Sequence, residues 1–246
     1  MGLKQRLVSL ANGALSVTGA RLVSAHNFEQ LQVLYRHRDS YDEPVFRVGQ
    51  RTLSYFAHRY NCGWPDLAWC SERSLELALA DTWLELVPPE TVTEIGAVTP
   101  YYWPCRVAEV VDPADPHPRV TARKSIFDVS LAGRSVLSVS TFEHIGRGDY
   151  GLPTQPGRAA AAIEKLFAES ATFLVTFGNG FNPPLDEFVI SRRGFPADVE
   201  THLFARNASG IGWTQRSVAA EAMRPYGSGT ANSVLIIHRG TDLFRS

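Results

Sequence analysis

The sequence predicts an α/β fold, in which a parallel sheet is covered by helices and preceded by an N-terminal extension. The chain has 246 residues, which suits one large α/β domain with an appendage. Beyond residue 70, short apolar runs rich in β-branched residues alternate with helical segments. Glycine or polar residues directly follow several of these runs, as they do where an open α/β sheet builds a ligand crevice. We therefore expect a helix and a substrate arm or lid over residues 1–70, and the main domain over residues 71–246.

Composition narrows the class of partner. The formal net charge is −1, so nothing points to nucleic acid or to an anionic membrane surface. The three cysteines, Cys62, Cys70 and Cys105, form no paired disulfide framework and lack metal-site spacing, which favours a reducing, cytoplasmic location. No apolar run reaches the length of about 18 residues that a membrane span needs, so we expect no span.

The first 70 residues are expected to surround the sheet rather than to form it. Leucine spacing predicts one helix over Gly2–Leu22. The segment Phe28–Gln50 is rich in charged and aromatic residues, which fits either a solvated connecting loop or a lid that contacts substrate. Arg51–Cys62 is aromatic-rich, and Trp64–Trp69 indicates a turn around a proline.

The clearest helix is Ser71–Leu86, whose first residue is an expected N-cap. Leu75, Leu79 and Trp83 share one face at helical spacing, and a Pro-Pro pair ends the helix. A second helix is predicted over Arg158–Glu169.

The first strand is Val92–Ile95, directly after that helix. Only ten residues separate its end from the second apolar run, and they include two prolines, so the first crossover must be a short turn. The further strands are predicted over Arg106–Val111, Val120–Arg123, Ser135–Ser140, Ala171–Thr176, Glu187–Arg193, Val199–Phe204 and Val234–His238.

Four groups of polar or glycine residues stand at the ends of these strands. They are Glu94–Gly96, Asp112, Ser140–His144 and residues 177–182, which face one crevice if the strands are parallel. Gly96 lets the backbone approach a ligand, although a single glycine is also what a simple turn needs. Asp112 is placed to accept hydrogen bonds from a ribose diol, or else it only initiates an Asp-Pro turn.

At these segments the chain resembles the class I S-adenosylmethionine-dependent methyltransferases. The resemblance rests on SERSLELAL, EIGAVTPYY, VVDP and VLSVSTFEHIG, and it covers roughly residues 70–240. The segment FGNGFNPPLD adds a likeness to enzymes of cell-surface sugar synthesis, and within them to the sugar O-methyltransferases of methylmannose polysaccharide biosynthesis. This resemblance implies a Rossmann-like sheet with helices on both faces and S-adenosyl-L-methionine as cofactor.

The resemblance also implies where the cofactor binds. The implied contacts are Glu94, Ile95, Gly96, Tyr102, Asp112, Ser125, Ser140 and Thr141. Two features depart from the family pattern. The glycine-rich loop retains only Gly96, and Ser125 stands where an acidic residue near the adenine is usual. Tyr101 or Tyr102 is expected to supply contacts that the missing glycines would leave to the backbone.

Methyl transfer needs alignment, worth roughly 7–11 kcal/mol, and an acceptor hydroxyl that has lost its proton. His144 is the candidate base because imidazole titrates near neutral pH, and Glu143 would orient the ring or lie beneath the sulfonium. The alternative is that His144 caps a turn and Glu143 is solvated. A Mg²⁺ ion stays open, since Glu143, Asp149 and Asp186 offer carboxylates but match no known ligand motif, so no metal ligand is assigned.

A sugar or short oligosaccharide, most simply a mannoside, is the expected acceptor. Aromatic faces and planar hydrogen-bonding groups bind sugars. The residues that supply them are Tyr60, Asn61, Asn182 and Trp213, with Tyr35, Arg36, His37, Arg38 and Tyr102 as further candidates.

Three alternative functions stay open: a methyltransferase-like partner subunit without cofactor, a methyltransferase of a non-sugar metabolite, and a nicotinamide enzyme. The last lacks the G-x-G-x-x-G pattern. A homodimer is a further open question.

Overall fold

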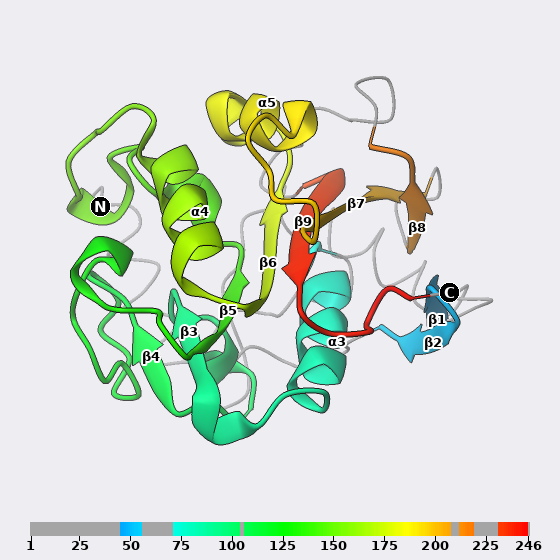
Figure 1. Ribbon diagram of the computed structural model, residues 1–246, viewed down its shortest axis with the longest axis horizontal. Helices are drawn as coiled ribbons and strands as arrows, with labels where there is room; N and C mark the ends of the chain where they lie inside the picture. The colour runs from blue at the N-terminus through cyan, green and yellow to red at the C-terminus, as the bar shows by residue number, and fades with distance from the viewer. Residues whose placement is uncertain (1–44, 56–70, 104–105, 208–211, 219–230, 246) are drawn as a thin grey trace, which may run out of the picture. The chain divides into compact units, whose positions relative to one another are not determined.

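A seven-stranded mixed sheet organises the part of the chain that the structure describes (Figure 1). The computed structural model describes residues 45–55, 71–103, 106–207, 212–218 and 231–245. All of them belong to one compact unit that spans residues 43–246. The helix expected over Gly2–Leu22, most of the Phe28–Gln50 segment and the turn at Trp64–Trp69 lie outside the described residues.

The strand order of the sheet is β4-β3-β5-β6-β9-β7-β8. The strands are β3 (Val92–Ile95), β4 (Glu109–Val111), β5 (Ser135–Val139), β6 (Thr172–Gly178), β7 (Glu200–Arg206), β8 (Trp213–Arg216) and β9 (Ser233–Arg239). The first four strands of that order are parallel, whereas β9 runs antiparallel to both β6 and β7, and β8 is antiparallel to β7. The next two strands along the chain, β4 and β5, lie on opposite sides of β3. The strand order therefore reverses beside β3, and such a reversal opens a crevice at the carboxyl edge of the sheet.

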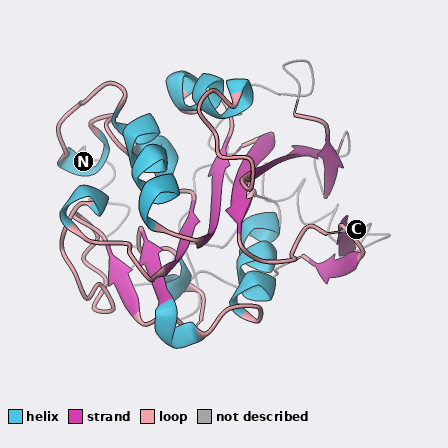
Figure 2. Cartoon of the chain, in the orientation of Figure 1, coloured by secondary structure: helices cyan, strands magenta, loops and turns pink. Residues whose placement is uncertain are grey.

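Helices cover both faces of this sheet (Figure 2). On one face, α3 (Arg73–Leu84) packs with the hairpin β1 (Val45–Val48) and β2 (Arg51–Ser54). On the other face lie α4 (Arg158–Glu169) and α5 (Pro183–Ser191). Side chains along the central strands alternate between the two cores, as the pleat requires. In β9, for example, Val234 and Ile236 face α3, whereas Leu235 and Ile237 face α4 and α5.

Several predicted elements are confirmed. Val92–Ile95 and Arg158–Glu169 match β3 and α4 residue for residue, and the predicted helix over residues 71–86 is α3 with shorter ends. The N-cap is Glu72 rather than Ser71, whose hydroxyl instead accepts the Arg73 N–H at 3.2 Å. The crossover after β3 is abbreviated as expected, since it contains only the 3₁₀ turn η4 (Thr99–Tyr101) between its described ends.

Other predictions are wrong. The sheet is mixed rather than parallel, and the segment Glu187–Arg193, predicted as a strand, belongs mostly to helix α5. Two prolines at the first helical positions start α5, and its short apolar run satisfies strand and helix patterns equally well. Val120–Arg123 makes only an isolated parallel bridge, from Ala122 to Val111, and the N–H groups of Thr121 and Ala122 donate to the Val110 carbonyl at 3.0 and 3.1 Å. Within the described residues, no helix has the length and apolar character that crossing a membrane requires.

Candidate functional site

A cavity of about 490 Å³ lies at the carboxyl ends of β3, β4 and β5. Most cofactor-binding residues predicted from the sequence line it, namely Ile95, Gly96, Tyr102, Asp112, Ser125, Ser140 and Thr141. His144, Tyr101, Arg73, Phe127, Tyr150 and Arg158 add polar and aromatic groups to its wall. The reversal of strand order beside β3 is therefore where the structure opens a ligand-sized space.

Gly96 lines this cavity with its backbone. Its φ is +87°, and its N–H donates to the carbonyl of Val111 at 2.9 Å. A Cβ at this position would lie 2.0 Å from Oγ1 of Thr141. Both the left-handed backbone and the close approach of Thr141 therefore require glycine here.

Glu94 anchors the loop that follows Gly96 rather than lining the cavity. Its carboxylate is fully buried and accepts the N–H groups of Val98 and Thr99 at 3.1 and 2.8 Å, together with the Thr99 hydroxyl at 2.5 Å. Burial raises the pKa of Glu94 to about 7, although the hydrogen bonds from Thr99 and Val98 lower it. The predicted direct contact of Glu94 with cofactor is thus replaced by support of the loop.

This carboxyl should make stability depend on pH. Because the folded pKa lies above the ordinary value, the folded state holds the extra proton, and stability falls as pH rises from about 4.5 to about 7. A shift of this size corresponds to about 3 kcal/mol. Glu94→Gln should flatten urea-unfolding stability across this range. Glu164→Gln, at an exposed site of α4, should leave the slope unchanged, and equal slopes in both variants would contradict the role of Glu94.

Asp112 organises the loop after β4 while still facing the cavity. One carboxylate oxygen accepts the Ala97 N–H at 3.1 Å, and the other accepts the N–H groups of Ala114 and Asp115 at 2.8 and 2.7 Å. The bond to Ala97 ties the end of β4 to the Gly96 turn. A carboxylate has about four lone-pair sites, so hydroxyl donors of a ligand could still be accepted.

A further group of residues forms an apolar slot in the wall of the cavity. Ser125 accepts the Phe127 N–H at 3.3 Å and so starts the 3₁₀ turn η5 (Ile126–Asp128). The guanidinium of Arg158 lies 3.4 Å from the centre of the Phe127 ring. Ile126 and Val111 add aliphatic walls, which suits a planar heteroaromatic group.

A buried charge network lies behind the cavity. Arg73 donates to Glu76 at 2.9 Å, and Glu76 also accepts the hydroxyl groups of Ser140 and Thr176 at 2.8–2.9 Å. The side chain of Arg73 is 21% exposed and that of Glu76 is fully buried. Ser140 has a positive φ of 41°, a strained conformation for a residue with a Cβ, and its hydroxyl is held by Glu76.

Glu143 and His144 point in different directions from one 3₁₀ turn, η6 (Phe142–His144). Glu143 is buried, accepts the Gly178 N–H at 3.3 Å, and does not line the cavity. Burial raises its pKa well above the ordinary value, and the nearby charge of Glu76 adds to the effect. Glu143 therefore does not orient His144.

His144 lines the cavity and is held by Asp149, whose carboxylate lies 2.9 Å from Nδ1. Its ring lies 5.2 Å from the Tyr150 ring and 4.7 Å from the Phe181 ring. Arg147 covers Phe181 at 4.5 Å, and Tyr150 is 73% exposed with a positive φ of 55°. An imidazole with an oriented Nδ1 thus stands beneath an exposed aromatic rim.

The structure describes two of the four residues predicted to bind substrate, and neither lines the cavity. Trp213 is buried in the core beneath Arg206, and Asn182 is buried and donates to the Glu143 carbonyl at 3.0 Å, so neither lines the cavity. Tyr60 and Asn61 lie outside the described residues, as do Tyr35–Arg38.

The carboxylates considered for Mg²⁺ have separate tasks. Asp149 holds His144, Glu143 is buried toward Gly178, and Asp186 accepts the Gly180 N–H at 2.9 Å. They are not brought together as a ligand group in the described part of the chain.

Four residues that line the site were not predicted, namely Arg73, Phe127, Tyr150 and Arg158, and Asp149 was considered only as a carboxylate for Mg²⁺. Asp149 carried a usable signal, since it follows His144 by five residues in a glycine-containing loop. The other four lie in two 3₁₀ turns and at the starts of two helices, and their meeting depends on tertiary packing. Comparison with family models, with curated proteins and with solved structures finds no match to this chain.

Proposed function

We propose that the chain is an S-adenosylmethionine-dependent O-methyltransferase that acts on a hydroxyl of a sugar or short oligosaccharide. The observation that carries the proposal is the cavity whose wall joins Gly96, Asp112 and Ser140, which directly follow three strands, with Ser125, and the sequence resemblance implies all four for this cofactor. They come from segments 44 residues apart at the extremes, so sequence proximity does not explain their meeting.

The strand order adds fold-level support. A doubly wound sheet with a reversed strand inserted near its end is the arrangement of the class I methyltransferase fold, and β9 is such a strand, although β8 at the edge is reversed as well.

The residues present suit the proposed cofactor. Asp112 would accept hydrogen bonds from the ribose diol, and the slot between Ile126 and Val111 would hold the adenine. Arg73 lines the cavity, and its guanidinium would pair with the amino-acid carboxylate as well as with Glu76. The turn at Gly96 would leave room for the part of the cofactor that joins the ribose to the amino-acid group. The sulfonium of the cofactor would supply an electrophilic methyl group.

The rim of the cavity supports a carbohydrate acceptor. Tyr150 and Leu152 are the two large apolar side chains that stand exposed within the described residues, and both line this cavity. Phe181 and Arg147 continue the aromatic and cationic surface. Such faces pack against the C–H surface of a pyranose ring, while His144 would take the proton of the hydroxyl that lies against it.

Gly96→Ala tests the proposed cofactor site. The added Cβ meets the Thr141 side chain and forces a strained backbone, so we expect loss of calorimetric S-adenosylhomocysteine binding and destabilisation by about 1–3 kcal/mol. Gly133→Ala is the matched control, because Gly133 has a similar φ of +72° with nothing within 4 Å of the added Cβ.

If the unmodified protein does not bind S-adenosylhomocysteine, the proposal of an enzyme is wrong, and a methyltransferase-like partner subunit is favoured instead. If binding occurs, product assays with mannosides, other sugars and free metabolites side by side decide the acceptor class. Methylation of metabolites alone would overturn the sugar assignment and leave methyl transfer standing.

A further inference from the structure

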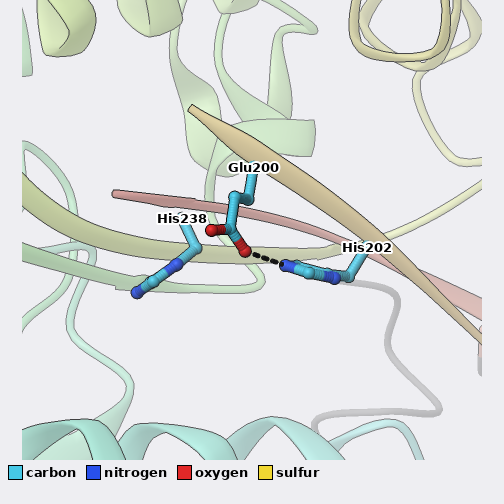
Figure 3. A group of neighbouring side chains, drawn as sticks. All are labelled: Glu200, His202 and His238. Carbon is cyan, nitrogen blue, oxygen red and sulfur yellow. Dashed lines mark hydrogen bonds and ion pairs between the residues drawn. The ribbon is translucent and has the colours of Figure 1, made fainter. Parts of the chain in front are cut away.

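Two histidines and a glutamate meet on β7 and β9, away from the cavity (Figure 3). They are Glu200, His202 and His238, and each offers one ligand atom within 4.8 Å of the other two. Figure 3 shows the Glu200 carboxylate between the two histidine side chains, with a dashed line joining it to the His202 ring.

The sheet register brings these side chains together. Glu200 lies directly opposite His238 in the antiparallel pair, and His202 is two residues further along β7. Residues two apart on a strand project to the same face, and directly opposed residues have Cβ atoms about 4.5–5.5 Å apart. The geometry is therefore fixed by backbone pairing.

One ligand atom is unsatisfied within the described part of the chain. Nδ1 of His238 is buried, in a residue only 1% exposed, and has no hydrogen-bond partner among the described residues. In Figure 3 the ring nitrogen nearer the Cβ, which is Nδ1, lies on the side of Glu200. A buried nitrogen without a partner is costly, and a ligand in this space would satisfy it.

The surroundings hold the rings in place. Nε2 of His238 lies 2.7 Å from the Thr241 hydroxyl, so a proton on Nε2 leaves the Nδ1 lone pair free for a ligand. Phe244 stacks on His202 at 3.8 Å, and Gln215 lies 3.2 Å from Nδ1 of His202.

We propose that Glu200, His202 and His238 bind one Zn²⁺-class divalent cation, with water completing the coordination. Two imidazoles and one carboxylate form a common ligand set for zinc. Ligands about 2.0–2.1 Å from a tetrahedral ion lie about 3.3 Å apart, and Nε2 of His202 is already 3.1 Å from the Glu200 carboxylate. His202 would lose its Nε2 proton and donate Nδ1–H to Gln215, whose amide would rotate to present oxygen.

The cation would stabilise the sheet near the amino end of β6, and it would take no part in methyl transfer. His238 pairs with Leu174 near the start of β6, whereas the cavity lies at the carboxyl ends of β3 to β5. Metal binding would tie β7 to β9 at this opposite edge, and it does not depend on the proposed activity.

Titration of the full-length, untagged and chelator-treated protein with ZnCl₂ tests the site. We expect one equivalent to bind, CoCl₂ to give the visible spectrum of four- or five-coordinate Co²⁺, and saturating Zn²⁺ to raise Tm by about 5–10 °C. Glu200→Gln, His202→Ala and His238→Ala should each weaken binding by roughly 100-fold or more, and Thr241→Val by roughly 10–100-fold.

His117→Ala is the matched control, because His117 lies on a different loop beside Tyr101 and should leave binding unchanged. Glu200 is exposed, so Glu200→Gln keeps the test valid if His238→Ala fails to fold. No binding to the unmodified protein, or full binding to Glu200→Gln and His202→Ala, would overturn the proposal.

Discussion

Replacing His144 by alanine should lower methyl-transfer turnover by roughly 10²–10⁴. The reason is the position of the ring: it lines the cavity, and Asp149 holds its Nδ1 at 2.9 Å. With the Nδ1 proton donated to Asp149, Nε2 carries the lone pair that can take a proton from an acceptor hydroxyl. Single-turnover rates with a methyl-accepting sugar measure the effect.

Binding of S-adenosylhomocysteine is the internal control, because His144 is proposed to contact the acceptor and not the cofactor. Asp149→Asn tests the positioning role separately. It should lower kcat while KM for the acceptor changes little, and it should shift the pH profile of kcat, which a merely structural residue would not do. Near-normal turnover of His144→Ala with intact cofactor binding would assign the ring to a structural role.

The cavity could be predicted from the sequence because its position depends on the topology of the sheet. Gly96, Asp112 and Ser140 each directly follow a parallel strand, and the carboxyl ends of parallel strands meet at one edge of a sheet. Their meeting needs only the correct strand order. Local side-chain detail is not required.

Orientation was harder to predict. Glu143 and His144 are adjacent, yet one is buried and the other lines the cavity, because consecutive residues on a 3₁₀ turn project about 120° apart. Glu94 was expected at the ligand, but on a strand buried on both faces a carboxylate is held by nearby N–H groups, here those of Val98 and Thr99.

Direction and long-range partners were not visible in the sequence. An apolar run does not encode whether a strand is parallel, so the reversal of β9 could not be predicted. His202 and His238, the histidines of the proposed metal site, lie 36 residues apart and meet only through the register of β7 and β9. A helix in place of the strand predicted over Glu187–Arg193 follows from packing of Leu185 and Val189 against α4.

Arg73→Met should destabilise the fold by about 3 kcal/mol near pH 7, at the lower end of what breaking a buried ion pair costs, because Arg73 is partly exposed. It leaves Glu76 buried without its cation, and it removes a positive charge that also lowers the pKa of Glu143. Urea unfolding measures the loss. Arg134→Met, which breaks the more exposed pair with Glu109, should cost at most about 1 kcal/mol.

The loss should depend on pH in a defined direction. Burial raises the pKa of Glu76, and the charge of Arg73 is the largest of the effects that lower this pKa. Removing Arg73 should therefore raise the pKa of Glu76 further. A carboxyl with a raised folded pKa is neutral at low pH and charged at high pH, so the penalty should be small near pH 5 and grow as pH rises. Adding Glu76→Gln should recover part of the loss, because a neutral amide still accepts the hydroxyl groups of Ser140 and Thr176. A pH-independent loss, or one no larger than that of Arg134→Met, would show that Glu76 does not depend on Arg73 for its charge.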